Sequence, residues 1–393
     1  MKKNRFLSTL IITLFLALLT AAPAFAKTVC KIGSKGYPSL QEAVNNVKDG
    51  ETIKVTKAIK ATVRVQCFPA LANKFTIDFK NKKYTYRGGD CALGVPVGKK
   101  VTIKNLNMDA DTGLFIKGTL QINSGKFQGG RLGWTDQQSN GKLVIKGGTF
   151  QCDRSESFAF FANMGTAEIS GGTFIGYPDN TNVDKHLFQN HGKGFISGGT
   201  WTNYGSPVVD VYKGEMTISG GTFKNVSEDG TASIWNRESL TIKGGTFRGV
   251  LDLWAGSDTT ITKGTVYGTS VGPTPGVTVR TGRGEETMVK IKGGTFKGLI
   301  EASEGSTFTL SGGKGTDCII SKKGSVINIK KFTVNQKVPN PRVAAILVSF
   351  GKIVVSGGSF TSPDGVGYCE VDEGKVIFKG VKAKSLFHVK ELT

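Results

Sequence analysis

A short pattern of alternating apolar and polar residues, ending in Gly-Gly-Thr-Phe, recurs along most of the chain. The clearest copy runs from Leu143 to Phe150, and similar copies end at Phe174, Trp201, Phe223, Phe247, Phe296 and Phe360. A spacing of about 22 to 27 residues is typical of a solenoid, because one such repeat cannot bury its apolar side without neighbours above and below it. The pattern therefore predicts a stack of coils.

Each copy contains a strand whose first and third residues are apolar, from Leu143 and Ile145 to Val376 and Phe378. Alternate residues of a strand point to opposite faces, so we expect these pairs to form apolar ladders inside the solenoid. The Gly pair is expected to turn every coil at the same place, since Gly tolerates positive φ, and the following Phe is expected to re-enter the core.

A second strand is predicted before each motif. Its copies are residues 158–161, 186–189, 208–211, 233–236, 250–253, 277–279, 299–302, 318–320, 345–348 and 386–389. Together these elements predict an all-β solenoid of about 14 coils, a rod on the order of 65 Å long at the usual strand spacing. Longer connections at 177–184, 271–276 and 335–342 are rich in Pro and Gly and are expected to be loops.

The start of the mature chain has the pattern of a cap for the open end of such a stack. Ser39 and Glu42 form a capping box, and Leu40, Ala43, Val44 and Val47 fall on one face of the helix it begins. Asp49-Gly50 is expected to end this helix before a strand at Thr52–Val55. A short amphipathic helix in this position can cover the first coil.

Two stretches in this region carry a resemblance to a known family. They are Tyr37-Pro38-Ser39-Leu40-Gln41-Glu42-Ala43-Val44 and Asp49-Gly50-Glu51-Thr52-Ile53, followed by the Gly-rich coils. In these features the chain resembles secreted pectin-lyase-like proteins, the right-handed parallel β-helix superfamily. The resemblance covers nearly all of the mature chain and implies that fold. It does not choose among the lyases, glycoside hydrolases, adhesins and binding proteins that share the architecture.

Residues 1–26 have the features of a secretory signal peptide. Basic residues come first, an apolar run follows from Leu7 to Leu19, and Ala24-Phe25-Ala26 is a cleavage site. No other apolar run is long enough to span a bilayer. We therefore expect a soluble monomer that is secreted or periplasmic, or associated with the cell surface, with no transmembrane segment. Its expected parts are a cap at 27–61 and a β-helix at 62–393.

The charge is concentrated at the two ends of the mature chain. Residues 27–104 contain 16 basic and 5 acidic residues, residues 314–393 contain 13 and 6, and the stretch between them contains 19 of each. Basic ends can bind polyanions such as acidic polysaccharide. The slightly favoured interpretation is that they discourage edge-to-edge pairing of the sheets.

Six cysteines remain after export, at positions 30, 67, 91, 152, 318 and 369. An exported chain can form disulfides, but the spacing neither selects a pairing nor indicates a metal site. Cys318 and Cys369 fall at similar positions two coils apart, roughly 10 Å at the usual strand spacing. That separation is too long for a bridge, so we expect buried thiols there.

The candidate ligand-binding residues are aromatic. Trp235 and Trp254 lie twelve residues before the motif Phe247 and its substitute Val266, which predicts the same position in consecutive coils, with Tyr212 beside them on the preceding coil. An exposed platform of this kind binds the C–H faces of sugar rings. The alternative is an aromatic stack inside the coils, since Trp is usually buried.

The candidate catalytic residues are less distinctive. Asp210 and Asp252 occupy second strands two coils apart, a separation of about 10 Å that is near the upper limit for an inverting acid and base pair. They fit solvated surface residues better. The resemblance does not extend to the adjacent Asp pair and Gly-His-Gly of polygalacturonase-like enzymes, of which Asn190-His191-Gly192 keeps only the His and the second Gly.

A lyase would need a base and a group that neutralises a uronate, either calcium or Arg. Arg280 and Arg283, near Glu285 and Glu286, form one candidate cluster, and His186, His191 and Lys185 form another. The Arg-x-Pro-x-x-Arg stretch of pectate-lyase-like enzymes is not matched at Pro339–Arg342. The sequence indicates no cofactor or metal, unless calcium serves a lyase.

Three functions remain open at this stage. The leading hypothesis is an exported β-helix that binds polysaccharide or a cell-surface polymer without strong catalysis, through Trp235, Trp254 and Tyr212. The second is a polysaccharide lyase or glycoside hydrolase that acts on acidic polysaccharide, and the third is a structural or adhesin-like surface protein. Nucleic acid is not an expected partner, because the chain has no recognised motif for it and is exported.

Overall fold

The structure is a computed structural model. It describes residues 27–66, 70–154, 159–178, 185–226, 232–268, 276–282, 284, 286–336, 347–361, 367–371, 373–380 and 387–391. The proposed signal peptide, Cys67, Arg283, Glu285 and nearly all of the three long connections therefore lie outside the described residues.

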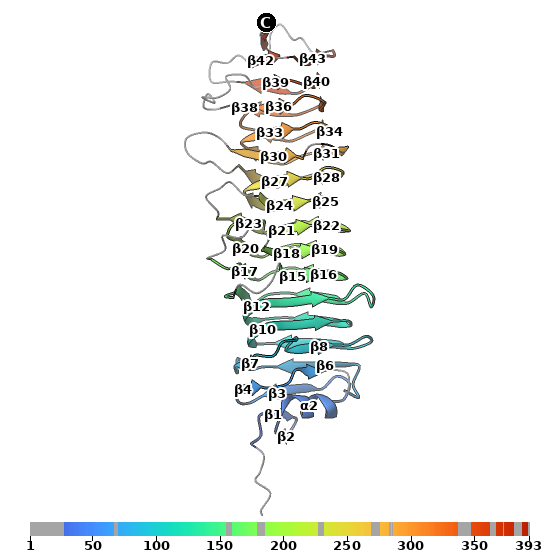
Figure 1. Ribbon diagram of the computed structural model, residues 1–393, viewed down its shortest axis with the longest axis vertical. Coiled ribbons are helices and arrows are strands. Elements are labelled where there is room, and N and C mark those ends of the chain that lie inside the picture. The colour runs from blue at the N-terminus through green and yellow to red at the C-terminus, as the bar shows by residue number, and fades with distance from the viewer. Residues whose placement is uncertain are drawn as a thin grey trace, which may run out of the picture.

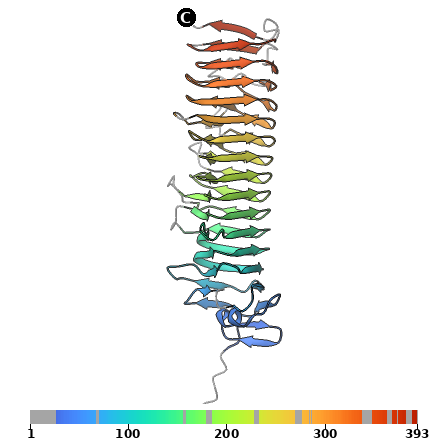
Figure 2. The same cartoon turned by 90° about the vertical axis from the view of Figure 1, so that its right-hand side faces the viewer.

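The chain is a parallel β-solenoid that rises as a single rod from the N-terminal cap to the C-terminus (Figures 1 and 2). This agrees with the expected right-handed parallel β-helix and roughly with its predicted number of coils. Each regular coil contributes one strand to each of three parallel ladders, and each strand pairs with its equivalents in the coils before and after it.

The first ladder contains the strands that precede the Gly pairs. These are β3 (Thr52–Val55), β6 (Lys74–Asp78), β9 (Lys100–Lys104), β11 (Thr119–Ile122), β13 (Lys142–Ile145), β16 (Thr166–Ile169), β19 (Lys193–Ile196), β22 (Glu215–Ile218), β25 (Ser239–Ile242), β28 (Asp258–Ile261), β31 (Thr287–Ile291), β34 (Ser306–Leu310), β37 (Val326–Ile329), β40 (Lys352–Val355) and β43 (Lys375–Phe378).

The second ladder contains the Thr-Phe strands that follow the Gly pairs. These are β4 (Ile59–Ala61), β7 (Tyr84–Tyr86), the first halves of β10 (Leu106–Ile116) and β12 (Gly125–Thr135), β14 (Thr149–Cys152), β17 (Thr173–Ile175), β20 (Thr200–Asn203), β23 (Thr222–Asn225), β26 (Thr246–Arg248), β29 (Thr265–Tyr267), β32 (Thr295–Lys297), β35 (Lys314–Gly315), β38 (Thr333–Asn335) and β41 (Ser359–Thr361).

The third ladder contains the strands predicted before each motif. These are β5 (Val65–Gln66), β8 (Leu93–Val95), the second halves of β10 and β12, β15 (Ala159–Asn163), β18 (His186–Asn190), β21 (Val209–Val211), β24 (Ala232–Asn236), β27 (Val250–Leu253), β30 (Val277–Thr281), β33 (Leu299–Ala302), β36 (Ile319–Ser321), β39 (Leu347–Ser349), β42 (Gly367–Val371) and β44 (Phe387–Glu391).

A small cap covers the N-terminal end of the stack. Strand β1 (Cys30–Ile32) pairs antiparallel with β2 (Lys35–Tyr37) and with β3, and helix α2 (Leu40–Asn46) packs beside them. Ser39 Oγ accepts a hydrogen bond from Glu42 N at 3.1 Å, as the capping box predicts. The predicted helix face is confirmed, because Leu40, Ala43, Val44 and Val47 are all buried.

The interior is filled by the side chains that the alternation predicts. The motif aromatics form a column, in which neighbouring rings from Phe150 through Phe174, Trp201 and Phe223 to Phe247 are nearly parallel and 3.8 to 5.9 Å apart between centroids. The apolar pairs of the first ladder are buried as expected, except that Val376 and Phe378 are only partly buried.

The Gly pair is favoured for two separate reasons. The second Gly of each pair has positive φ, for example 110° at Gly172 and 103° at Gly221, which side-chain-bearing residues rarely adopt. The first Gly lies against the coil below, so that a Cβ at Gly171 would come within 2.6 Å of the carbonyl oxygen of Lys146. The predicted turn is therefore confirmed. The pair is not kept in every coil, because Lys263 occupies the position of its first Gly and Lys331-Phe332 occupy both positions.

The described cysteines are buried. Cys369 pairs with Leu347, which pairs with Ile319, so Cys318 and Cys369 lie two coils apart as predicted. Cys30, Cys91 and Cys152 form no disulfide. Burial raises the pKa of the Cys30 thiol to about 12, which keeps it protonated at neutral pH.

No helix among the described residues is long and apolar enough to cross a membrane.

Candidate functional site

The third ladder presents one side chain per coil at its outward position, and these positions are in register along the rod. They are Gln66, Gly94, Phe115, Trp134, Ala162, Gln189, Asp210, Trp235, Asp252, Arg280 and Glu301. Two residues later, the turn that follows adds a second line, which contains Lys117, Asp136, Met164, His191, Tyr212, Arg237 and Trp254. We call this surface the third-ladder face.

All seven candidates from the sequence lie on the third-ladder face. The four candidate catalytic residues are Asp210, Asp252, His191 and Arg280, and the three candidate ligand-binding residues are Trp235, Trp254 and Tyr212. Tyr212 and Trp254 are 47% and 39% exposed, and Trp235 is half-buried. The aromatic rings therefore lie outside the core, whose aromatic column is made by the motif residues instead.

The centre of the aromatic group is Arg237, which the sequence analysis did not single out. Its guanidinium carbon lies 4.0 Å from the ring centre of Trp254, 5.0 Å from that of Tyr212 and 5.3 Å from that of Trp235. A cation over an aromatic face is attracted by the ring quadrupole. We call Arg237, Tyr212, Trp235 and Trp254 the aromatic–arginine cluster.

The two indoles do not occupy equivalent positions, which corrects the expectation from the sequence. Trp235 pairs with Asp252, whereas Trp254 follows Leu253 and so is equivalent to Arg237. The two rings are tilted by 59°, with centroids 5.5 Å apart. The expectation failed because counting from the motif assumes turns of equal length. The turn after β27 contains Trp254 to Ser257, two residues more than the turn after β24.

Asp210, in the coil before that of Arg237, forms an ion pair with Arg237. Its carboxylate is fully buried, and it accepts hydrogen bonds from Arg237 Nε and from Gln189 Nε2, both at 3.2 Å. His186 Nε2 lies 3.4 Å from the same carboxylate. A buried carboxylate with this many donors is held as an ion-pair partner. Asp210 therefore fixes the orientation of the guanidinium between the three rings.

Asp252 is also engaged by an arginine. Arg280 Nη2 donates to Asp252 Oδ2 at 2.7 Å, and this hydrogen bond raises the pKa of the Arg280 guanidinium. Asp210 and Asp252 lie two coils apart, as the sequence predicts, but Trp235 occupies the position between them. Neither carboxylate is thus an unpaired acid that faces open space.

His191 stands at the end of the cluster, with its ring 4.8 Å from that of Tyr212. Burial lowers the pKa of its imidazole, so that the neutral form is favoured. His186 is the first residue of β18, whereas His191 follows the last one, and the His186 ring centre lies 5.5 Å from that of Trp235. The two imidazoles of this predicted cluster therefore contact different members of the aromatic–arginine cluster.

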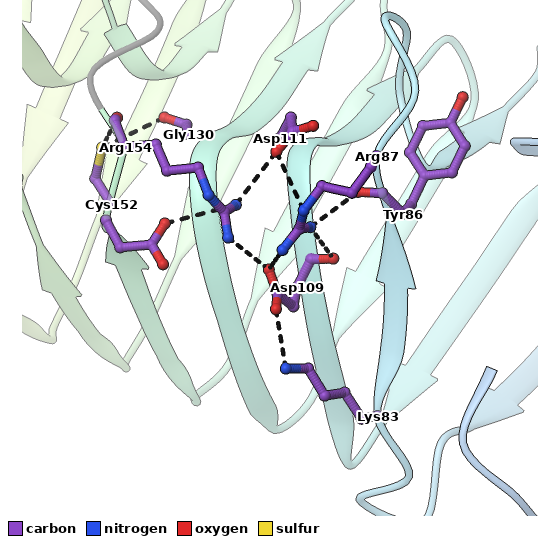
Figure 3. Close-up of polar contacts among 9 residues, drawn as sticks. Lys83, Tyr86, Arg87, Asp109, Asp111, Gly130, Cys152 and Arg154 are labelled. Carbon is purple, nitrogen blue, oxygen red and sulfur yellow. Dashed lines mark hydrogen bonds and ion pairs between the residues drawn. The ribbon is translucent and has the colours of Figure 1, made fainter. Parts of the chain in front are cut away.

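A separate ionic cluster joins coils near the N-terminal end on the second ladder (Figure 3). Asp109 is bound by Arg87 at 2.6 Å, by Arg154 at 2.8 Å and by Lys83 at 2.9 Å, and Asp111 lies within 3.7 Å of both arginines. Partial burial alone would raise the pKa of Asp109, but the hydrogen bonds from Arg154, Lys83 and Arg87 outweigh it and hold this pKa well below its usual range. Asp153 lies 3.6 Å from Arg154 and makes three carboxylates for the three cations. Because opposite charges are matched within the cluster, we interpret it as a structural connection between coils.

Among the described residues, no three His, Cys, Asp or Glu side chains come together as metal ligands. Comparison with family models, with curated proteins and with solved structures finds no match to this chain.

Proposed function

We propose that this protein binds polysaccharide, or another polymer of the cell surface, through the aromatic–arginine cluster. The observation that carries the proposal is the exposure of Tyr212 and Trp254 around a guanidinium that Asp210 holds in place. Aromatic rings bind the C–H faces of sugars, and a fixed guanidinium can donate hydrogen bonds to hydroxyl or carboxylate oxygens.

The rigidity of the cluster supports binding in particular. Arg237 uses Nε for Asp210, while its two terminal nitrogens form no hydrogen bond with the described residues. A donor that is already oriented loses little side-chain entropy when a ligand arrives. The straight register of the third-ladder face also suits an extended polymer better than a small molecule.

The enzyme alternative has weaker support. Both candidate carboxylates are paired with arginines, and the bulky Trp235 separates them. A general acid or base should be able to reach a substrate proton. An absorbance assay for unsaturated uronate, together with a reducing-sugar assay, separates the two functions, because a binding protein releases no product.

Affinity electrophoresis in gels that contain neutral or acidic glycans tests the proposal. We expect Tyr212→Ala/Trp254→Ala to lose retention by at least one glycan roughly tenfold, since each aromatic contact contributes about 0.5–1.5 kcal/mol. Phe350→Ala is a matched control, because Phe350 is 38% exposed at the equivalent turn position of a distant coil. Unchanged retention of the double variant would contradict the proposal.

A further inference from the structure

The third-ladder face contains a second feature, nearer the N-terminal cap. A hollow of about 530 Å³ is lined by Arg64, Gln66, Gly94, Val95, Pro96, Phe115 and Lys117. This volume falls within the range of about 300–1,000 Å³ that is usual for small-molecule sites. We call it the Gly94 hollow.

The hollow exists because one side chain is missing from the line of outward positions. Gly94 pairs with Gln66 on one side and with Phe115 on the other, so the space that a side chain would occupy between them stays open. A Cβ at Gly94 would meet only the end of the Gln66 side chain, at 2.9 Å. The backbone of the hollow therefore does not require Gly.

The charge of the lining is of one sign. Among the described residues of the lining, Arg64 and Lys117 contribute two cations and there is no carboxylate. Arg64 is bound to Asp90 at 3.0 Å, outside the lining. Lys117 is exposed, lies 5.3 Å from the ring centre of Phe115 and has no ion pair with the described residues. Lys117 is thus available for an anion from solution.

An aromatic surface continues from the hollow toward the next coil. The rings of Phe115 and Trp134 are 5.0 Å apart and tilted by 36°, and the Arg131 guanidinium carbon lies 4.8 Å from the Trp134 ring centre. A ring face beside a lysine can hold the apolar face of a sugar while the lysine binds an acidic group of the same sugar.

We propose that the Gly94 hollow is a second binding site, which takes an acidic sugar unit. Phe115 contacts the ring, and Lys117 binds the carboxylate. This inference rests on the proposed polysaccharide binding and makes it more specific. Phe115 in the hollow and Asp210, whose coil carries Tyr212, lie four coils apart, about 19 Å at the usual strand spacing, so one polymer can contact both sites on the same face.

Isothermal titration with tetragalacturonate, its methyl ester and a hyaluronan tetrasaccharide tests the site, with Tyr212→Ala/Trp254→Ala as the background. We expect at least one acidic oligosaccharide to bind more tightly than its neutral counterpart. Gly94→Val, which fills the hollow without a change in charge, should weaken this binding at least tenfold. Lys117→Gln should weaken it about tenfold, since a charged hydrogen bond is lost, and should leave the ester unaffected.

Lys126→Gln is the matched control, because Lys126 is exposed on the second ladder, outside the lining of the hollow, and carries the same charge. Thermal unfolding checks that Gly94→Val folds like the parent. The proposal is overturned if no acidic oligosaccharide binds, if Gly94→Val binds like its parent, or if only anionic phosphatidylglycerol vesicles bind. Retention through Tyr212 and Trp254 in the wild-type chain is measured separately, so a failure at the hollow does not decide the proposed function.

Discussion

Arg237 illustrates how a single residue acquires its role from three neighbouring coils. Its anchor, Asp210, lies one coil away, and the rings it contacts come from β24 and from the turns after β21 and β27. Asp210 is fully buried, whereas the Arg237 side chain is 25% exposed. A buried carboxylate is tolerated only when it is paired and hydrogen-bonded, so the pair also matters for stability.

Substitution of the anchor tests this at the residue scale. We expect Asp210→Asn to lower the free energy of unfolding by about 3 kcal/mol, because the guanidinium and the neighbouring donors lose a buried anionic partner. Urea unfolding at neutral pH measures the change. Asp258→Asn is the control, since Asp258 and Lys290 form an exposed pair 3.8 Å apart that should contribute less than about 1 kcal/mol. Equal effects of the two substitutions would contradict the assigned role of Asp210.

At the scale of elements, ionic contacts tie successive strands together where the coils are least regular. The Asp109 cluster joins Lys83 and Arg87, which flank β7, and Arg154, which follows β14, to β10 across the second ladder. The long strands β10 and β12 each belong to two ladders and lack the Gly-Gly turn. Side-chain pairs here supply a connection between coils that the repeated motif supplies later in the chain.

The cluster predicts a dependence of stability on pH. The pKa of Asp109 is lower in the folded chain than the value of about 3.9 expected in the unfolded chain. Its contribution is therefore complete above about pH 4 and is lost as the pH falls through the folded-state value. We expect Asp109→Asn to be less stable than wild type at pH 7, and this difference to shrink below pH 4. Denaturant midpoints between pH 7 and pH 2.5 measure it, and a constant difference would exclude the assignment.

At the scale of the whole molecule, each coil contacts chiefly the coils directly above and below it. The first-, second- and third-ladder strands all pair with the equivalent strands of adjacent coils, without long-range crossing between distant coils. In such a solenoid the stability is approximately a sum over coils and their interfaces. A complete coil is therefore the unit that can be removed.

Removal of residues 293–311 tests this, because it joins Lys292 to Gly312-Gly313 and deletes β32, β33 and β34 together. We expect the shortened chain to unfold cooperatively and to be about 4.8 Å shorter. Removal of residues 293–302 leaves β34 without its second and third strands and should abolish cooperative unfolding. Circular dichroism and small-angle scattering distinguish the outcomes. Similar behaviour of the two deletions would contradict the model of independent coils.

Much of the architecture is predictable from the chain because its signals are local. The alternation in Leu143–Ile145, the Gly pair and the following Phe each specify a strand, a turn or a buried ring within a few residues. The predicted second strands agree with β15, β18, β21 and β24 to within about one residue at most ends. The candidate residues on these strands consequently fall on one face, as the structure has them.

The sequence by itself determined the solenoid, two of the three strands of each coil and the burial of the motif Phe. Only the tertiary structure decided how side chains meet between coils. The longer turn before Ser257 moves Trp254 beside Arg237, Asp210 becomes a buried anchor, and the absence of a side chain at Gly94 opens a hollow beside Phe115. The physical reason is that a strand pattern depends on neighbours in sequence, whereas these contacts depend on turn lengths and on register between residues far apart in the chain.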